Sequence, residues 1–242
     1  MIQIALECSG RQGSISVLDR EKGLWDRPLG VESSTAAEIG PVLKAALEWC
    51  ESRAENPRFV SVAVGPGSFT GIRIAVTAAK TLAFALDLPV VSVGSLTAIA
   101  AATHLPRPTR RILVGLNAFR NQVFVNRFQA EQLRLPDALH RCNHEVETVS
   151  RSQWDAMVQQ ALESPEEAIS SDPTILSESA KSAVANRERV DAVGVGRVAW
   201  GLLSGNPQQL GNPAESAVLE DAFSLAARYV KLSAAEEKAA ER

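Results

Sequence analysis

The sequence of 242 residues predicts a mixed α/β protein built from two domains. Its first part alternates strand-like apolar runs with helical patterns, the order expected of sheets covered by helices. A second unit begins with another pair of strand-like runs. Between the units, residues 105–111 contain two prolines and three arginines, which interrupt regular structure. We therefore expect domains at 1–105 and 106–232 and a charged tail at 233–242.

The first unit shows the clearest patterns. Apolar residues recur at helical spacing over 35–53, and Ser33, Ser34 or Thr35 can cap that helix. The segment 71–86 is also helical but apolar around almost its whole circumference, so we expect it to be buried on more than one side. The other predicted elements are strands at 2–7, 14–18, 23–29, 59–64 and 89–93, and a helix at 95–103.

The second unit is less regular. Turn-forming residues predict loops at two places, and the Ala, Glu, Lys and Arg of the tail predict a solvated, frayed helix end. The predicted elements are strands at 112–116 and 122–128, helices at 153–162 and 187–203, and loops at 164–173 and 205–213.

Composition narrows the function classes. A formal charge of -3 without massed Lys and Arg argues against strong unaided RNA binding. The three cysteines lie far apart and match neither a zinc spacing nor a disulfide framework, which favours a reducing cytoplasm. The N-terminus lacks the regions of a signal peptide, and Lys80, Asp87 and Pro89 interrupt the longest apolar region. We expect a cytoplasmic protein without a membrane span.

The most specific feature is the segment 60–96, VSVAVGPGSFTGIRIAVTAAKTLAFALDLPVVSVGSL. A buried strand enters a glycine-containing loop, and a helix leaves it. Gly65 and Gly67 permit positive φ and close backbone approach, and Pro66 fixes φ between them. Ser68 or Thr70 can cap the helix.

Known phosphate and nucleophile motifs do not fit this loop. Ile72 and Arg73 follow Gly71 where a P-loop needs lysine and a hydroxyl residue, and the flanks of Ser68 do not form a nucleophile elbow. Two interpretations stay open: a tight turn required by packing, and a surface used in recognition.

Segment 60–96 resembles the signature of the TsaB family, bacterial partner proteins in tRNA threonylcarbamoyladenosine biosynthesis that are related to TsaD and more distantly to actin-like ATPases. The runs IQIALECSGRQGSISVL at 2–18 and ARYVKLSAAEEK at 227–238 are similar to the family's opening hairpin and closing segment, whereas 120–215 matches loosely. The resemblance implies two actin-like (ribonuclease H-like) domains, each a mixed sheet flanked by helices.

The resemblance also implies a function. A TsaB-like chain is a non-catalytic subunit that dimerises with a TsaD-like catalytic subunit, stabilises it and allows a TsaE-like ATPase to bind. The complex modifies the adenosine 3′ of the anticodon in ANN-decoding tRNA, so this chain would meet tRNA only through the complex. Alone, it could form a homodimer. We expect no catalytic, cofactor-binding or metal-binding residues.

The family pairs through its first two helices, which correspond here to 35–53 and 71–86. The pattern agrees, because a helix with two apolar sides needs a second burial partner besides its own sheet. The pattern leaves open which side faces the sheet. The candidate contact residues are Ile39, Leu43, Leu47, Ile72, Arg73, Val76 and Lys80.

The acids that hold Mg²⁺ and a triphosphate are missing from the expected places. Glu7 stands where the family commonly has aspartate, and Asn117 replaces the aspartate that TsaB proteins usually carry at the start of the second domain. Efficient ATP hydrolysis is therefore not expected, although weak nucleotide binding in a vestigial cleft stays open. The alternative is an actin-like small-molecule kinase or ATPase that uses Glu7 and the loop 65–71.

Metal-dependent chemistry also lacks support. TsaD carries paired histidines on its first-domain helices, and the corresponding helices here contain none. His140, Cys142 and His144 could approach a zinc ion but have no fourth ligand, so we expect a solvated loop. A peptidase would need a metal pair or a nucleophile triad, and the sequence shows neither.

Overall fold

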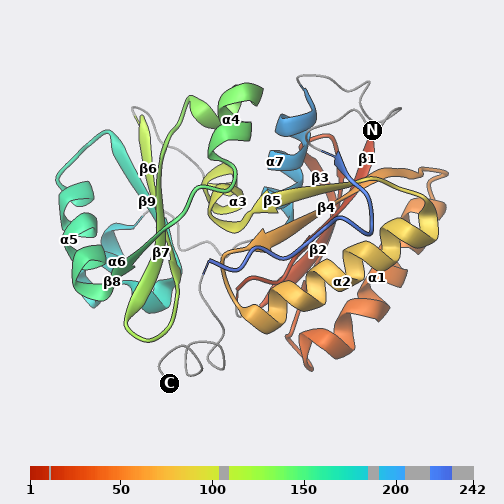
Figure 1. Ribbon diagram of the computed structural model, residues 1–242, viewed down its shortest axis with the longest axis horizontal. Helices are drawn as coiled ribbons and strands as arrows, with labels where there is room; N and C mark the ends of the chain where they lie inside the picture. The colour runs from red at the N-terminus through yellow and green to blue at the C-terminus, as the bar shows by residue number, and fades with distance from the viewer. Residues whose placement is uncertain (11, 104–108, 185–190, 205–218, 231–242) are drawn as a thin grey trace.

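The computed structural model describes residues 1–10, 12–103, 109–184, 191–204 and 219–230. Two sheets with their helices lie side by side (Figure 1). The six-stranded sheet has the order β10 (Leu219–Glu220), β5 (Val90–Gly94), β4 (Pro57–Gly65), β1 (Ile2–Glu7), β2 (Gly13–Asp19), β3 (Lys22–Leu29). The four-stranded sheet has the order β8 (Glu147–Ser150), β7 (Gln122–Gln129), β6 (Arg111–Asn117), β9 (Glu167–Ser171).

Both sheets are mixed, as expected. In the first, β1, β4 and β5 run parallel, and β2, β3 and β10 join antiparallel. In the second, β6 pairs with β9 in parallel, and β7 pairs antiparallel with both β6 and β8. The central strand β1 is buried along its whole length, which explains why it reads as an almost unbroken apolar run.

Helices cover both faces of the first sheet (Figure 1). One face packs against α1 (Thr35–Glu51) and α2 (Phe69–Leu86), and the other against α3 (Ser95–Ala102) and α7 (Ala192–Ser204). The core under α3 and α7 continues onto one face of the second sheet, so α3 joins the two halves. The opposite face of the second sheet packs against α5 (Arg151–Leu162) and α6 (Glu178–Ala183).

The strands and helices predicted for the first unit are confirmed, and the caps are now assigned. The Ser34 side chain caps α1 by accepting from the N–H of Ala37, and Ser68 caps α2 by accepting from the N–H of Gly71. By length and composition α2 could cross a membrane, but its buried face packs on the sheet as a core helix does.

The second unit differs from the prediction in two elements and adds others. The expected loop at 164–173 contains β9, whose residues Ser170 and Ser171 are polar but fully buried. The stretch around His140 is not a loop but the helix α4 (Pro136–Cys142), and Cys142 is buried. Short 3-10 turns lie at Gln132–Arg134 and Pro173–Ile175. The predictions for 187–190, 205–213 and 233–242 concern residues outside the described ranges.

Two elements from the later part of the chain pack on the first sheet. Helix α7 contacts β1, β2 and β4, and β10 pairs with β5. The domain boundary at residue 105 stays a prediction. If domains are defined by packing, α7 and β10 belong to the first unit.

Candidate functional site

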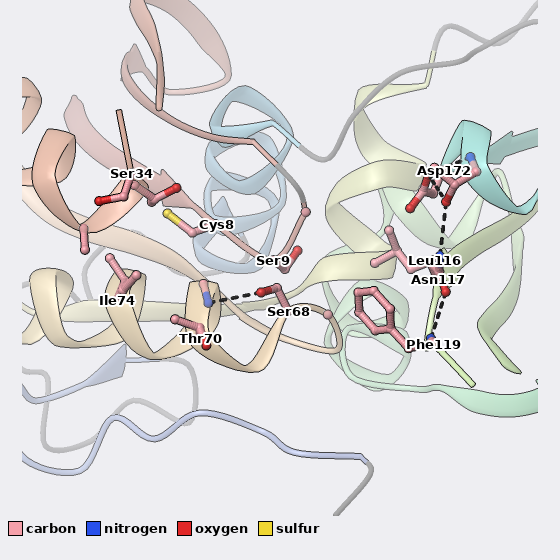
Figure 2. Close-up of a pocket in the computed structure, with 16 residues that line it drawn as sticks. Cys8, Ser9, Ser34, Ser68, Thr70, Ile74, Leu116, Asn117, Phe119 and Asp172 are labelled. Atoms are coloured by element: carbon pink, nitrogen blue, oxygen red, sulfur yellow. Dashed lines mark hydrogen bonds between the residues drawn. The ribbon is translucent and has the colours of Figure 1, made fainter. Parts of the chain in front are cut away.

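A cavity of about 490 Å³ opens between the two units (Figure 2). From the first unit it is lined by the turn after β1, the N-terminal residues of α1 and the glycine loop that leads into α2. From the second unit it is lined by Leu116, Asn117, Phe119, Asp172 and Thr174. The predicted loop and Asn117 therefore meet across one cleft, although they lie far apart in the sequence.

Backbone contacts hold the glycine loop against the turn after β1. The N–H of Ser68 donates to the carbonyl oxygen of Ser9 at 2.7 Å. A Cβ at Gly67 would collide with that same carbonyl, and a Cβ at Gly71 would collide with the carbonyl oxygen of Cys8. These close approaches are what a tight packing turn requires.

The opposite wall is a small hydrogen-bonded network. The Asp172 carboxylate accepts from the backbone N–H of Thr174 at 2.9 Å and from its hydroxyl at 2.7 Å. The Asn117 amide donates to the Thr174 hydroxyl at 3.2 Å and accepts from the N–H of Phe119 at 2.8 Å (Figure 2). The sequence interpretation did not single out Asp172, Phe119 or Thr174.

Glu7 does not line this cavity. Its side chain is fully buried, and its Oε1 accepts from the N–H and hydroxyl of Ser9. Burial raises the pKa of Glu7 to about 8, and the nearby Asp191 also raises it. The carboxyl is therefore mainly protonated near neutral pH, and a protonated carboxyl is a poor ligand for Mg²⁺.

The residues expected at a partner contact fall into three groups. Ile39, Ile72 and Val76 are buried within this chain, in the core between the first sheet and its two helices. Leu43 and Leu47 are half-buried beside that core. Arg73 is exposed, and Lys80 is half-buried.

Residues 221–230, which we call the strap, cover part of the second apolar side of α2. Leu225 enters the core and is 1% exposed, and the Lys80 ammonium donates to the carbonyl oxygens of Phe223 at 3.3 Å and Leu225 at 3.0 Å. The strap thus supplies one of the burial partners that an apolar helix needs. The cover is incomplete, because Phe84 near the end of α2 remains 67% exposed.

Near the glycine loop, the end of the strap contacts Arg73, whose guanidinium stacks on an aromatic ring. The Arg73 guanidinium lies 3.9 Å from the ring centre of Phe69, and its Nε donates to the Tyr229 hydroxyl at 2.9 Å. The N–H of Arg228 donates to the carbonyl oxygen of Val64 at 2.8 Å. Arg73 and Lys80, predicted as partner contacts, are therefore both engaged with the strap.

The strap contact leads to a prediction for Lys80. The Lys80→Met variant should lose about 1 kcal/mol of unfolding free energy, because it keeps the apolar stem and removes two charge-assisted hydrogen bonds at a partly exposed site. Urea unfolding measures the change. Lys44→Met is the control, since the ion pair of Lys44 on α1 with Glu48, at 3.6 Å, is exposed. Equal effects of the two changes would contradict the role assigned to Lys80.

Within the described part of the chain, no group of three or more His, Cys, Asp or Glu side chains is placed to hold a metal ion. Cys142 lies in the core, where its thiol contacts the carbonyl oxygen of Leu139 at 3.5 Å. His140 and His144 instead line a separate cavity.

Comparisons with known proteins bear on this site. The family model for TsaD, tRNA N6-adenosine threonylcarbamoyltransferase, matches residues 28–239. The tRNA threonylcarbamoyladenosine biosynthesis protein TsaB of Bacillus subtilis is 33% identical over 101 residues, which cover 42% of this chain and 44% of that protein. TsaB of Haemophilus influenzae is 31% identical over 105 residues, which cover 43% of this chain and 40% of that protein. The chain thus aligns with less than half the length of these curated relatives.

A solved structure extends the likeness to the whole fold. The crystal structure of an uncharacterized protein with similarity to peptidase YEAZ from Pseudomonas aeruginosa has a TM-score of 0.64 and 16% sequence identity. The superposition covers 95% of this chain and 99% of that chain. At this identity the likeness concerns the fold, and it agrees with two mixed sheets flanked by helices.

Proposed function

This chain belongs to the TsaD family, and on that premise we propose that it is a TsaB-type, non-catalytic subunit in tRNA threonylcarbamoyladenosine biosynthesis. It binds a TsaD-like catalytic subunit and stabilises it, and the pair then admits a TsaE-like ATPase. The chain works in the cytoplasm and meets the adenosine 3′ of the anticodon in ANN-decoding tRNA only through the complex. Alone, it pairs with a second copy through the same helices.

The composition of the cleft carries the non-catalytic part of the proposal. Asp172 is the only acid among the described residues that line the cavity, and none of those residues is Lys or Arg. A site for Mg²⁺ and a triphosphate needs carboxylates near the phosphates. The buried Glu7 does not supply one. The kinase alternative would instead be favoured by tight, magnesium-dependent ATP binding with turnover in calorimetry.

The accessible faces of α1 and α2 support the partner-binding part. Several exposed positions on these helices carry small side chains, which let another helix approach closely. They include Ala37 and Ala45 on α1 and Thr77, Thr81 and Ala85 on α2. Since Ile39, Ile72 and Val76 are buried in the chain's own core, the proposed contact uses the outward residues of the same two helices, with Leu43 and Leu47 beside them.

The test is binding to the TsaD-type subunit of the same organism, with an arginine introduced on α1. Ala45→Arg should weaken the complex roughly 30-fold or more, because a charge buried at an interface without a partner costs at least about 2 kcal/mol. Calorimetry measures the affinity, and size-exclusion chromatography shows whether the isolated chain is a dimer.

Ala156→Arg is the matched control, because Ala156 is likewise an exposed alanine inside a helix, on α5 of the second unit. The control should bind as the unchanged chain does. If the folded, unchanged pair fails to associate, the proposed function loses its mechanism. If both arginine variants bind equally well, the contact lies elsewhere.

A further inference from the structure

A second cavity, of about 430 Å³, lies away from the cleft, where α4 ends beside the first sheet. The side chains that matter in its lining are His140, Arg141, Asn143, His144, Glu220 and Arg228. They come from the end of α4, from β10 and from the strap. Neither the family likeness nor the proposed function assigns a role to this cavity.

The hydrogen bonds of Asn143 fix the orientation of its amide. Asn143 is 3% exposed, and its Oδ1 accepts from the backbone N–H of Gly94 at 3.0 Å. Its Nδ2 donates to the carbonyl oxygen of Ser92 at 3.2 Å. If the amide were reversed, its NH₂ group would face the N–H of Gly94, donor against donor, and its oxygen would face the carbonyl oxygen of Ser92, acceptor against acceptor. Only one orientation therefore satisfies both contacts.

That orientation determines the tautomer of His144. The Asn143 Nδ2 lies 3.2 Å from the His144 Nε2, and an amide nitrogen can only donate. Nε2 must therefore accept, and the hydrogen of the neutral ring sits on Nδ1. Burial, with further contributions from Arg228 and His140, lowers the pKa of His144 to about 4, so the ring is neutral at pH 7.

The Nδ1–H is then a donor that lacks an acceptor. The Nδ1 atom is buried, and no hydrogen-bond partner for it exists among the residues that the structure describes. A buried donor without a partner costs free energy, and such groups are uncommon in native proteins. An acceptor would satisfy this donor, and His144 is one of the residues that line the cavity.

Charge around the cavity defines what kind of acceptor fits. Arg141 and Arg228 are exposed side chains in its lining, and within the described ranges neither forms a salt bridge. Glu220 is the one acid among the described residues that line the cavity, so the arginines leave an excess of positive charge. Guanidinium groups pair with carboxylate and phosphate through two parallel N–H donors, and a phosphate has enough oxygens to accept from two arginines and a histidine at once.

We propose that this cavity binds a phosphate group, whose charge Arg141 and Arg228 neutralise and one of whose oxygens accepts from the His144 Nδ1–H. The chemistry is the same for inorganic phosphate and for a phosphodiester of RNA, so the experiment separates these sources. This inference does not depend on the proposed function.

The test is an NMR titration of the full chain at pH 7.5 and constant ionic strength, first with inorganic phosphate and then with a short single-stranded RNA. Before any addition, the histidine ¹⁵N shifts should show His144 protonated on Nδ1. Phosphate should then produce saturable shifts at the His144 ring and the Asn143 side-chain amide. Saturation by RNA alone would assign the site to a phosphodiester, and saturation by phosphate alone to a free phosphate.

Three variants make the result specific. Arg228→Gln should weaken binding roughly 3-fold to 10-fold, and Glu220→Gln should tighten it by a similar factor because it removes the opposing charge. Arg58→Gln should leave the affinity unchanged, since Arg58 is an exposed arginine on β4 outside the lining. Absence of saturable shifts with both ligands, the opposite tautomer, equal effects of Arg58→Gln and Arg228→Gln, or no gain in Glu220→Gln would each overturn the proposal.

Discussion

Replacing Gly71 by alanine is expected to lower the free energy of unfolding by about 3 kcal/mol or more. The new Cβ would collide with the carbonyl oxygen of Cys8, which belongs to the turn after the buried strand β1. Because the obstacle is backbone, a side-chain rotation cannot relieve the collision. The glycine loop would have to move away, and the bond from Ser68 to Ser9 would lengthen. Urea unfolding of both proteins measures the loss.

The same substitution at Gly40 is the control. Gly40 also lies inside a helix, but nothing lies within 4 Å of a Cβ built there. Alanine has the better helix propensity, whereas the following Pro41 disfavours a Cβ at this position, so the net change should stay within about 1 kcal/mol. A Gly71→Ala protein as stable as the unchanged chain would contradict the packing role of the glycine loop.

The first sheet could be predicted because its sequence signals are local and strong. Strand β1 is buried along its whole length and α1 has a regular apolar stripe, so period and burial agree there. The glycine loop is also a local signal, and it marked the junction between β4 and α2. Chain topology was less accessible, since the return of α7 and β10 to the first sheet depends on contacts between residues far apart in the sequence.

The second sheet was harder to predict from the sequence, because some of its buried residues are polar. Strand β9 reads Glu-Ala-Ile-Ser-Ser, yet both serines are fully buried at its end. Pattern analysis treats such a run as a loop. With β9 missed, Asp172 at the end of that strand could not be recognised as part of the cleft.

The candidate partner surface shows a different limit. The pattern of α2 is apolar on nearly all sides, so periodicity could not tell which residues face outward. The structure places Ile72 and Val76 in the core and lays the strap over Lys80. The sequence analysis could not identify the strap as a cover for α2. Leu225 packs in the same core as α2, but the two segments lie far apart in the sequence.

Glu7 should make the protein less stable as pH rises through neutrality. Its pKa is raised from 4.5 to about 8 by burial in the folded chain, whereas the unfolded chain releases the proton near pH 4.5. Between these values the folded state binds more protons than the unfolded state, so unfolding free energy falls with rising pH. The loss is small at pH 5 and is complete above pH 8. Between pH 5 and pH 8 it amounts to about 3–4 kcal/mol.

Glu7→Gln should remove this dependence, because an amide of nearly the same shape carries no titrating proton. Its carbonyl oxygen can still accept from the N–H and hydroxyl of Ser9. Urea unfolding at pH 5, 6.5 and 8 should show the unchanged chain losing several kcal/mol more than the variant over that range, and the difference between the two proteins cancels other titrating groups such as His144. Glu48→Gln, which removes an exposed carboxylate from α1, is the control. Parallel pH slopes for the unchanged chain and the Glu7→Gln variant would mean that burial does not hold the Glu7 carboxyl protonated in the folded protein.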